Sequence, residues 1–164
     1  MILGSAGTGK TTLAAKLHTI SDARLISLDS IWQPEWTEKD VPAFKELLAE
    51  AHRPETWISE GNFALATFDL RLPQATQIVW LEQPVITSLW RSTRRVLRRG
   101  EPHRIKGLLK VYKFIWNFDR INRPRILSVI DQLGAEGKVV HLHSKCEVDD
   151  FIARYTNALS LRQC

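Results

Sequence analysis

Cysteine is scarce in this sequence of 164 residues, and long apolar runs are absent. The two cysteines, Cys146 and Cys164, are too few for a disulfide framework or a four-cysteine zinc site. No apolar run approaches the ~18 residues of a membrane-spanning helix, and no signal peptide is recognisable at the N-terminus. We therefore expect a cytoplasmic chain with no membrane partner.

Acidic residues are nearly missing from one segment of a chain whose formal net charge is +5. In this segment a single acid, Glu101, stands among nine basic residues: Arg91, Arg94, Arg95, Arg98, Arg99, Arg104, Lys106, Lys110 and Lys113. Elsewhere acidic residues slightly outnumber basic ones. A local excess of positive charge predicts a phosphate-rich partner for the segment. A solvated basic face and a nucleic-acid patch are the alternatives.

Short β-type runs alternate with longer amphipathic runs, and no repeat or linker interrupts them. Strands are predicted at Met1–Leu3, Arg24–Leu28, Thr56–Ser59, Gln77–Leu81 and Lys138–His143. Helices are predicted at Lys10–Ser21, Val41–Ala51, Pro84–Arg99, Gly107–Phe118, Arg125–Leu133 and Glu147–Ala158, with a loop at Glu101–Arg104. The alternation predicts one α/β domain over residues 1–164, with a five-stranded parallel sheet and helices on both faces. We expect the short first strand to be weakly anchored.

Residues 4–11 read Gly-Ser-Ala-Gly-Thr-Gly-Lys-Thr and match the P-loop (Walker A) pattern G-x-x-x-x-G-K-[ST] at every fixed position. An apolar strand precedes the pattern and an amphipathic helix follows it. Backbone N–H groups of such a loop and the start of its helix form a cradle for phosphates. Lys10 is expected to reach the β- and γ-phosphates, and the Thr11 hydroxyl to bind Mg²⁺. The predicted ATP site comprises Gly4, Ser5, Ala6, Gly7, Thr8, Gly9, Lys10, Thr11 and Thr12.

Further motifs follow along nearly the whole chain. They are Leu28-Asp29 with Trp32 and Pro34-x-Trp36, Trp57-Ile-x-Glu-Gly-Asn62, Leu70-Arg71-Leu72, Leu89-Trp90-Arg91, Arg94-Arg95, Trp116-Asn117-Phe118 and Arg123-Pro124. With the loop, they resemble the small P-loop kinases, such as adenylate and shikimate kinases, and more narrowly the group called DNA topology modulation proteins. The resemblance implies a three-layer α/β/α P-loop NTPase fold, ATP and Mg²⁺ as cofactors, and a helical arginine-rich lid at about residues 99–122.

Two predicted strands end in residues suited to acceptor chemistry. Asp29 follows the second strand, at the sheet edge where α/β proteins bind ligands, and a carboxylate there can orient an acceptor hydroxyl as a base. The resemblance implies the same role for Asp29, a contact of Glu60 with Mg²⁺ or its water, and close substrate approach at Gly61. Asn62 is a candidate hydrogen-bond partner of the acceptor. A helix cap at Asp29 and a structural role for Glu60–Asn62 are the alternatives.

Two other residues are candidates for holding the acceptor. The resemblance implies that Arg71 binds its phosphate or acidic group, for which a planar guanidinium is well suited. A surface ion pair between Asp69 and Arg71 is the alternative. Trp32 follows Asp29 and is a candidate for stacking on the acceptor, and packing in the core explains it equally well.

Arginines of the basic segment are candidates for contacting the transferring phosphoryl group. Arg91, Arg94, Arg95 and Arg98 have the spacing of one helical face. The resemblance implies that lid arginines neutralise charge on the phosphoryl oxygens. The candidates for this are Arg95, Arg99 and Arg104, with Arg123 from beyond the lid.

These features together favour an enzyme that transfers the γ-phosphoryl group of ATP, with Mg²⁺, to a small acceptor. The acceptor classes considered are nucleosides, nucleotides and small metabolites. The alternative is a nucleotide-responsive nucleic-acid-binding protein, or a regulatory P-loop ATPase without kinase activity. The enzyme is favoured because the basic residues cluster at the position of the lid.

Overall fold

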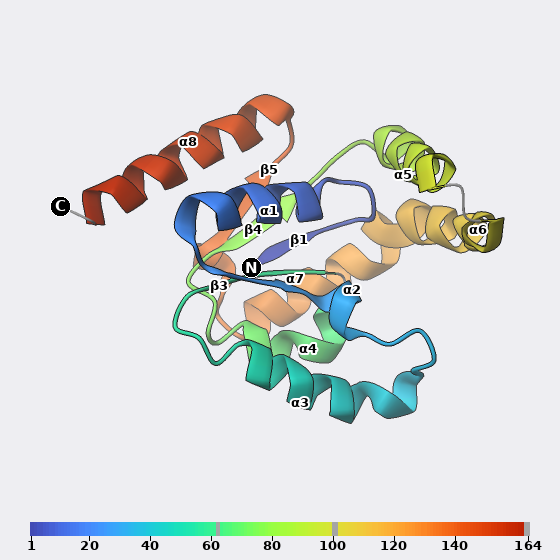
Figure 1. Cartoon of the computed structure of the whole chain (residues 1–164), viewed down its shortest axis with the longest axis horizontal. Helices are drawn as coiled ribbons and strands as arrows, with labels where there is room; N and C mark the ends of the chain where they lie inside the picture. The colour runs from blue at the N-terminus through green and yellow to red at the C-terminus, as the bar shows by residue number, and fades with distance from the viewer. Residues whose placement is uncertain (62, 100–101, 163–164) are drawn as a thin grey trace.

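Five parallel strands form one sheet in the order β2-β3-β1-β4-β5 in the computed structural model (Figure 1). The strands are β1 (Ile2–Gly4), β2 (Arg24–Ser27), β3 (Trp57–Glu60), β4 (Ile78–Leu81) and β5 (Val139–Leu142). The structure describes residues 1–61, 63–99 and 102–162, and within these ranges the side chains of residues 64, 99, 102–106 and 162 lie outside the description. The α/β class and the five parallel strands are confirmed. Both ends of each strand lie within one residue of the predicted ends.

The first strand is the centre of the sheet, contrary to the expectation of weak anchoring. β1 pairs with β3 on one side and β4 on the other, so that Ile2 lies opposite both Glu60 and Val79. Ile2 and Leu3 are buried, and the Met1 ammonium donates a hydrogen bond to the Gln77 carbonyl oxygen at 2.8 Å. Pairing on both edges thus compensates for the short length of β1.

Helices connect all of the strands. They are α1 (Lys10–Ser21), α2 (Leu28–Ile31), α3 (Val41–Ala51), α4 (Ala64–Arg71), α5 (Val85–Arg99), α6 (Pro102–Asn117), α7 (Arg123–Gln132) and α8 (Lys145–Arg162). Shorter helical turns are η1 (Glu38–Asp40), the π-helical η2 (Phe118–Asn122) and η3 (Glu136–Lys138). None of the described helices has the length and hydropathy needed to cross a membrane.

Three differences from the predicted helices concern the site. The loop expected at Glu101–Arg104 is wrong for residues 102–104, which begin α6, because proline fits the first turn of a helix; Glu101 itself lies outside the described residues. The short helices α2 and α4 were not predicted. As a result Asp29 lies inside α2 rather than at the end of a strand.

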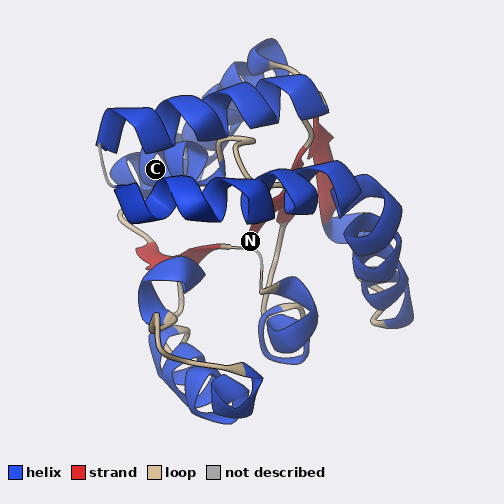
Figure 2. Ribbon diagram, turned by 90° about the vertical axis from the view of Figure 1, so that its right-hand side faces the viewer, coloured by secondary structure: helices blue, strands red, loops and turns tan. Residues whose placement is uncertain are grey.

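Helices cover both faces of the sheet, an arrangement compatible with the expected three layers (Figure 2). On one face Leu13 and Leu17 of α1 pack with Phe151 of α8 against β4. On the other face Phe68 of α4 and Ile126 of α7 pack with Trp80. The chain leaves β1 in one direction for β2 and β3 and in the other for β4 and β5. Ligands of open α/β sheets bind at the carboxyl ends of the strands beside such a reversal.

Candidate functional site

Residues 4–11, here called the glycine-rich loop, leave the carboxyl end of the central strand and lead into α1. Gly9 has φ 102° and caps α1, whose first N–H groups therefore face the end of the loop. At Gly7, φ is +79°, and a Cβ atom would lie 2.5 Å from the Ser88 carbonyl oxygen of α5 and 2.9 Å from the Ser92 Oγ. Glycine is thus required at position 7 both by its backbone conformation and by the close contact with α5.

Lys10 begins α1 and is only 8% exposed. Its Nζ donates a hydrogen bond to the carbonyl oxygen of Ser5, at 2.8 Å, so the side chain folds back over the loop. Burial lowers the pKa of Lys10 to about 8; the negative charges of Glu60 and Asp29 oppose this decrease, and the positive charge of Arg95 adds to it. A buried ammonium with so few partners is suited to receiving an anion.

Glu60, at the end of β3, is 2% exposed and lies next to the first turn of α1. Its Oε1 accepts hydrogen bonds from Ser27 Oγ at 2.7 Å and from Thr11 Oγ1 at 3.3 Å. A hydroxyl and a carboxylate side by side are oxygen donors of the kind that Mg²⁺ binds. Across the ranges that the structure describes, no three His, Cys, Asp or Glu side chains gather as a metal site of their own.

A cleft of about 440 Å³ opens over the loop, whose residues 6–9 line it with Thr12, and brings five further predicted residues together. These are Lys10, Thr11, Asp29, Glu60 and Arg95. The cleft is also lined by Lys16, Arg91, Lys145 and Asp149. Basic side chains outnumber acidic ones in this lining, five to three, which favours an anionic ligand. Arg91 was not among the predicted cleft residues, although its spacing of four from Arg95 is the signal that places both on one face.

Arg71 is not brought to this cleft. The side chain is fully buried, and its guanidinium donates to Thr67 Oγ1 at 3.0 Å and to Ser59 Oγ at 3.3 Å. Burial lowers its pKa to about 10, against the effect of Glu60. The alternative pair with Asp69 is not formed either, since Asp69 bonds Lys45 at 2.6 Å. The helix α4, which the sequence did not predict, turns Arg71 toward β3 and away from the surface.

Trp32 and Gly61 also have structural partners. The ring of Trp32 lies 4.8 Å from that of Phe63 and 5.1 Å from that of Phe44, measured between centroids. Trp32 thus packs within an aromatic cluster, which agrees with the second of its two interpretations, a place in the core. At Gly61, a Cβ atom would lie 2.6 Å from the Leu28 Cβ. Glycine is therefore required at position 61 because Leu28, the residue before Asp29, packs closely against it.

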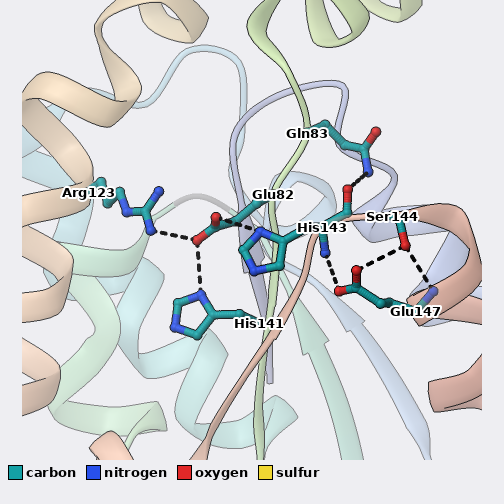
Figure 3. A network of polar contacts seen from close by, with 7 residues as sticks. All are labelled: Glu82, Gln83, Arg123, His141, His143, Ser144 and Glu147. Carbon is teal, nitrogen blue, oxygen red and sulfur yellow. Dashed lines mark hydrogen bonds and ion pairs between the residues drawn. The ribbon is translucent and has the colours of Figure 1, made fainter.

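Arg123 lies outside the cleft, in a network around Glu82 (Figure 3). Its Nη2 is 2.8 Å from Glu82 Oε1, and the same carboxylate accepts contacts from the Nδ1 atoms of His141 at 2.9 Å and His143 at 3.0 Å. Arg123 also lines a neighbouring cavity of about 290 Å³ with Ser5. The network joins the ends of β4 and β5 to the start of α7. No local pattern in the sequence pointed to Glu82.

The remaining predicted residues fall into two groups. Some belong to the glycine-rich loop or follow it, and the others lie outside the described part of the chain. Gly4, Ser5, Ala6, Gly7, Thr8, Gly9 and Thr12 belong to the glycine-rich loop or follow it directly. Asn62 and the side chains of Arg99 and Arg104 lie outside the described residues.

The chain matches no protein-family model and shows no significant similarity to a curated protein. The resemblance to small P-loop kinases therefore remains a prediction from the motifs of this sequence.

Proposed function

We propose that this chain is a P-loop protein that binds Mg·ATP in the cleft and transfers the γ-phosphoryl group to the hydroxyl of a small acceptor. The observation that carries the proposal is the position of Lys10. It is buried at the start of α1, folded over a loop that fits G-x-x-x-x-G-K-[ST], and it lines a cleft rich in basic side chains. A triphosphate is the anion that suits such a cradle.

In this proposal the loop and Lys10 bind the phosphates. The N–H groups at the start of α1 have no helical partners and donate to phosphate oxygens. The Lys10 ammonium leaves the Ser5 carbonyl oxygen, 2.8 Å away, for the β- and γ-phosphates. Because the ammonium is already desolvated, the exchange costs little further desolvation, and the favourable charge interaction is retained.

Thr11 and Glu60 are the residues that would hold Mg²⁺. Their oxygens lie 3.3 Å apart, and Ser27 fixes the carboxylate from the other side. Mg²⁺ usually binds through one or two protein oxygens together with waters and phosphates, which agrees with this small donor set. When bound, it would neutralise charge on the phosphate oxygens during transfer.

Asp29 and the arginines of α5 complete the reaction centre that we propose. The Asp29 carboxylate is exposed in the cleft, where it accepts a proton from the acceptor hydroxyl. Arg91 and Arg95 lie on the opposite wall and donate to the oxygens of the transferring group. An acid near an acceptor hydroxyl favours transfer over simple hydrolysis of ATP.

The experiment is transfer of ³²P from γ-labelled ATP across a panel of nucleosides, nucleotides and small hydroxylated metabolites. We expect labelled product with at least one acceptor class and none when EDTA removes Mg²⁺. ATP hydrolysis that no acceptor stimulates would contradict phosphoryl transfer to an acceptor. The absence of any turnover would contradict the proposal that the chain is an enzyme.

A further inference from the structure

Arg91, Arg94, Arg95 and Arg98 of α5 line one hollow, which agrees with the single face that their spacing predicts, and they form two neighbouring stripes on it. Arg91 and Arg95 line the cleft. Trp90, Arg94 and Arg98, spaced four apart, lie along the exposed side and line a shallow hollow of about 600 Å³ that also touches the cleft arginines. Phosphoryl transfer in the cleft requires only the first stripe, so the second has no place in the proposed reaction.

Trp90 is the unusual member of this second stripe. It is 58% exposed, and the guanidinium carbon of Arg94 lies 5.3 Å from the centre of its ring. Ile86 and Leu97 are also exposed on this helix, at 80% and 67%. These side chains place apolar surface beside several charges of one sign, and an exposed apolar patch rimmed by polar groups is typical of a binding surface.

The charge of the surface selects an anionic partner. Helix α5 contains five arginines and no acidic residue. The high density of positive charge along one helix attracts a chain of regularly spaced negative charges, since each added phosphate contact releases counterions. The exposed Trp90 indole adds a flat apolar surface. An acidic polypeptide has no regularly spaced flat group that could stack on it.

We propose that the stripe Trp90-Arg94-Arg98 binds single-stranded nucleic acid. Arg94 and Arg98 contact successive phosphates, and an unpaired base stacks on the face of the Trp90 ring opposite the Arg94 guanidinium. A single strand is favoured over a duplex because only unpaired bases are free to stack on a side chain. The surface reads no sequence, and ribose and deoxyribose strands bind alike.

The hollow and the cleft are neighbours, because Arg91 and Arg95 line both of them. A nucleotide in the cleft contacts Arg91 and Arg95 and leaves Arg94, Arg98 and the indole free. Mg·ATP is therefore expected to weaken binding of the strand without displacing it, and Lys10→Ala should bind the strand like wild type.

The test is fluorescence anisotropy with labelled oligouridylate and oligothymidylate of about 12 nucleotides, a length in the range of single-strand sites. The double variant Arg94→Gln/Arg98→Gln should bind at least tenfold more weakly, with a shallower dependence of affinity on salt by about one to two phosphate contacts. The matched control is Arg24→Gln/Arg154→Gln, which removes the same charge from exposed arginines of β2 and α8 and should stay within twofold of wild type. Trp90→Ala should weaken binding about five- to hundredfold.

Four results would overturn the proposal. They are no binding at low salt, equal loss in the two double variants, no effect of Trp90→Ala, and displacement of the oligonucleotide by Mg·ATP. Polyglutamate of equal charge is the competitor that separates partner classes. If it displaces the oligonucleotide at the same charge concentration, the surface binds acidic chains in general and the assignment to nucleic acid is wrong.

Discussion

The two walls of the cleft are built in opposite ways. On the wall formed by the glycine-rich loop, α1 and β3, here called the buried wall, Lys10 and Glu60 are buried and held by hydrogen bonds: Lys10 to Ser5, and Glu60 to Thr11 and Ser27. On the α5 wall, Arg91 and Arg95 are exposed. The walls meet where Gly7 packs against Ser88 and Ser92.

This difference indicates a division of labour between the walls. Groups that are fixed before the ligand arrives lose little conformational entropy on binding, so under the proposed function the buried wall would set where a triphosphate lies. Exposed arginines are free to reorient, and they add charge wherever it develops. Substitutions in the buried wall should therefore have larger effects than substitutions in the exposed wall.

The largest expected effect is that of Lys10→Ala, which removes the ammonium from the buried wall. Turnover of ATP should fall about 10³–10⁵-fold, the range known for single charges that stabilise a transferring phosphoryl group. The fold should remain intact, which circular dichroism checks, because the variant removes a desolvated charge. Lys39→Ala, at an exposed lysine of η1, is the control and should keep full turnover.

Asp29→Asn should lower phosphoryl transfer about 10²–10³-fold and change the Kd of ATP less than twofold, since the carboxylate acts on the acceptor. Transfer rates and equilibrium binding measured on the same preparation separate the two effects. Asp149→Asn is the matched control, because Asp149 is another acid that lines the cleft. An equal loss of transfer and ATP binding would contradict the role of Asp29 at the acceptor hydroxyl.

Gly7→Ala tests the junction between the walls. The added Cβ atom meets the Ser88 carbonyl oxygen at 2.5 Å in a left-handed conformation, so loop and helix have to separate. We expect a decrease in Tm of roughly 2–12 °C, from about 1–3 kcal/mol of strain and overpacking. ATP binding should weaken about tenfold or more. Gly137→Ala, where no atom lies within 4 Å of the added Cβ, should leave Tm and binding unchanged.

Arg95→Gln tests the exposed wall and should weaken ATP binding about tenfold, the value of one charge-assisted hydrogen bond near the surface. The loss should shrink at high salt, because the pair is open to solvent. Arg94→Gln, on the other stripe of α5, should leave ATP binding unchanged. If Arg94→Gln and Arg95→Gln weaken ATP equally, the two stripes do not differ.

The smallest effect is on pH dependence and comes from the lowered pKa of Lys10, about 8. Bound phosphates raise this pKa, so the complex holds more protons than the free protein above pH 8. ATP affinity should accordingly fall as pH rises through about 8, with uptake of roughly three-quarters of a proton at pH ~8.5. Calorimetry in two buffers of different ionisation enthalpy measures the uptake, and the control Lys39→Ala, which keeps Lys10, should show the same uptake as wild type. No uptake in wild type would mean that Lys10 is charged before ATP binds.

The sequence predicted those parts of the fold that local patterns control. Alternating strand and helix patterns located all five strands, and α1 and α3 begin and end at their predicted residues. The glycine-rich loop was identified because its chemistry lies within eight consecutive residues. The short α2 and α4 were missed because their few residues carry too little helical periodicity to distinguish them from loops.

Site residues that depend on contacts between distant segments were harder to predict. Arg71 was expected at the acceptor, but its direction is set by α4 and by Thr67 and Ser59. Arg123 was expected at the phosphates, and its ion pair with Glu82, 41 positions away, follows from tertiary packing. The sequence position of a charged residue does not show whether its side chain binds a ligand or pairs with another side chain.

The most direct test of the central claim is calorimetric titration of the wild-type protein with Mg·ATP at millimolar concentration. We predict saturable heat for one site per chain, lost in Lys10→Ala and retained in Lys39→Ala. The absence of heat in wild type, or the same heat in both lysine variants, would contradict a triphosphate bound by the glycine-rich loop.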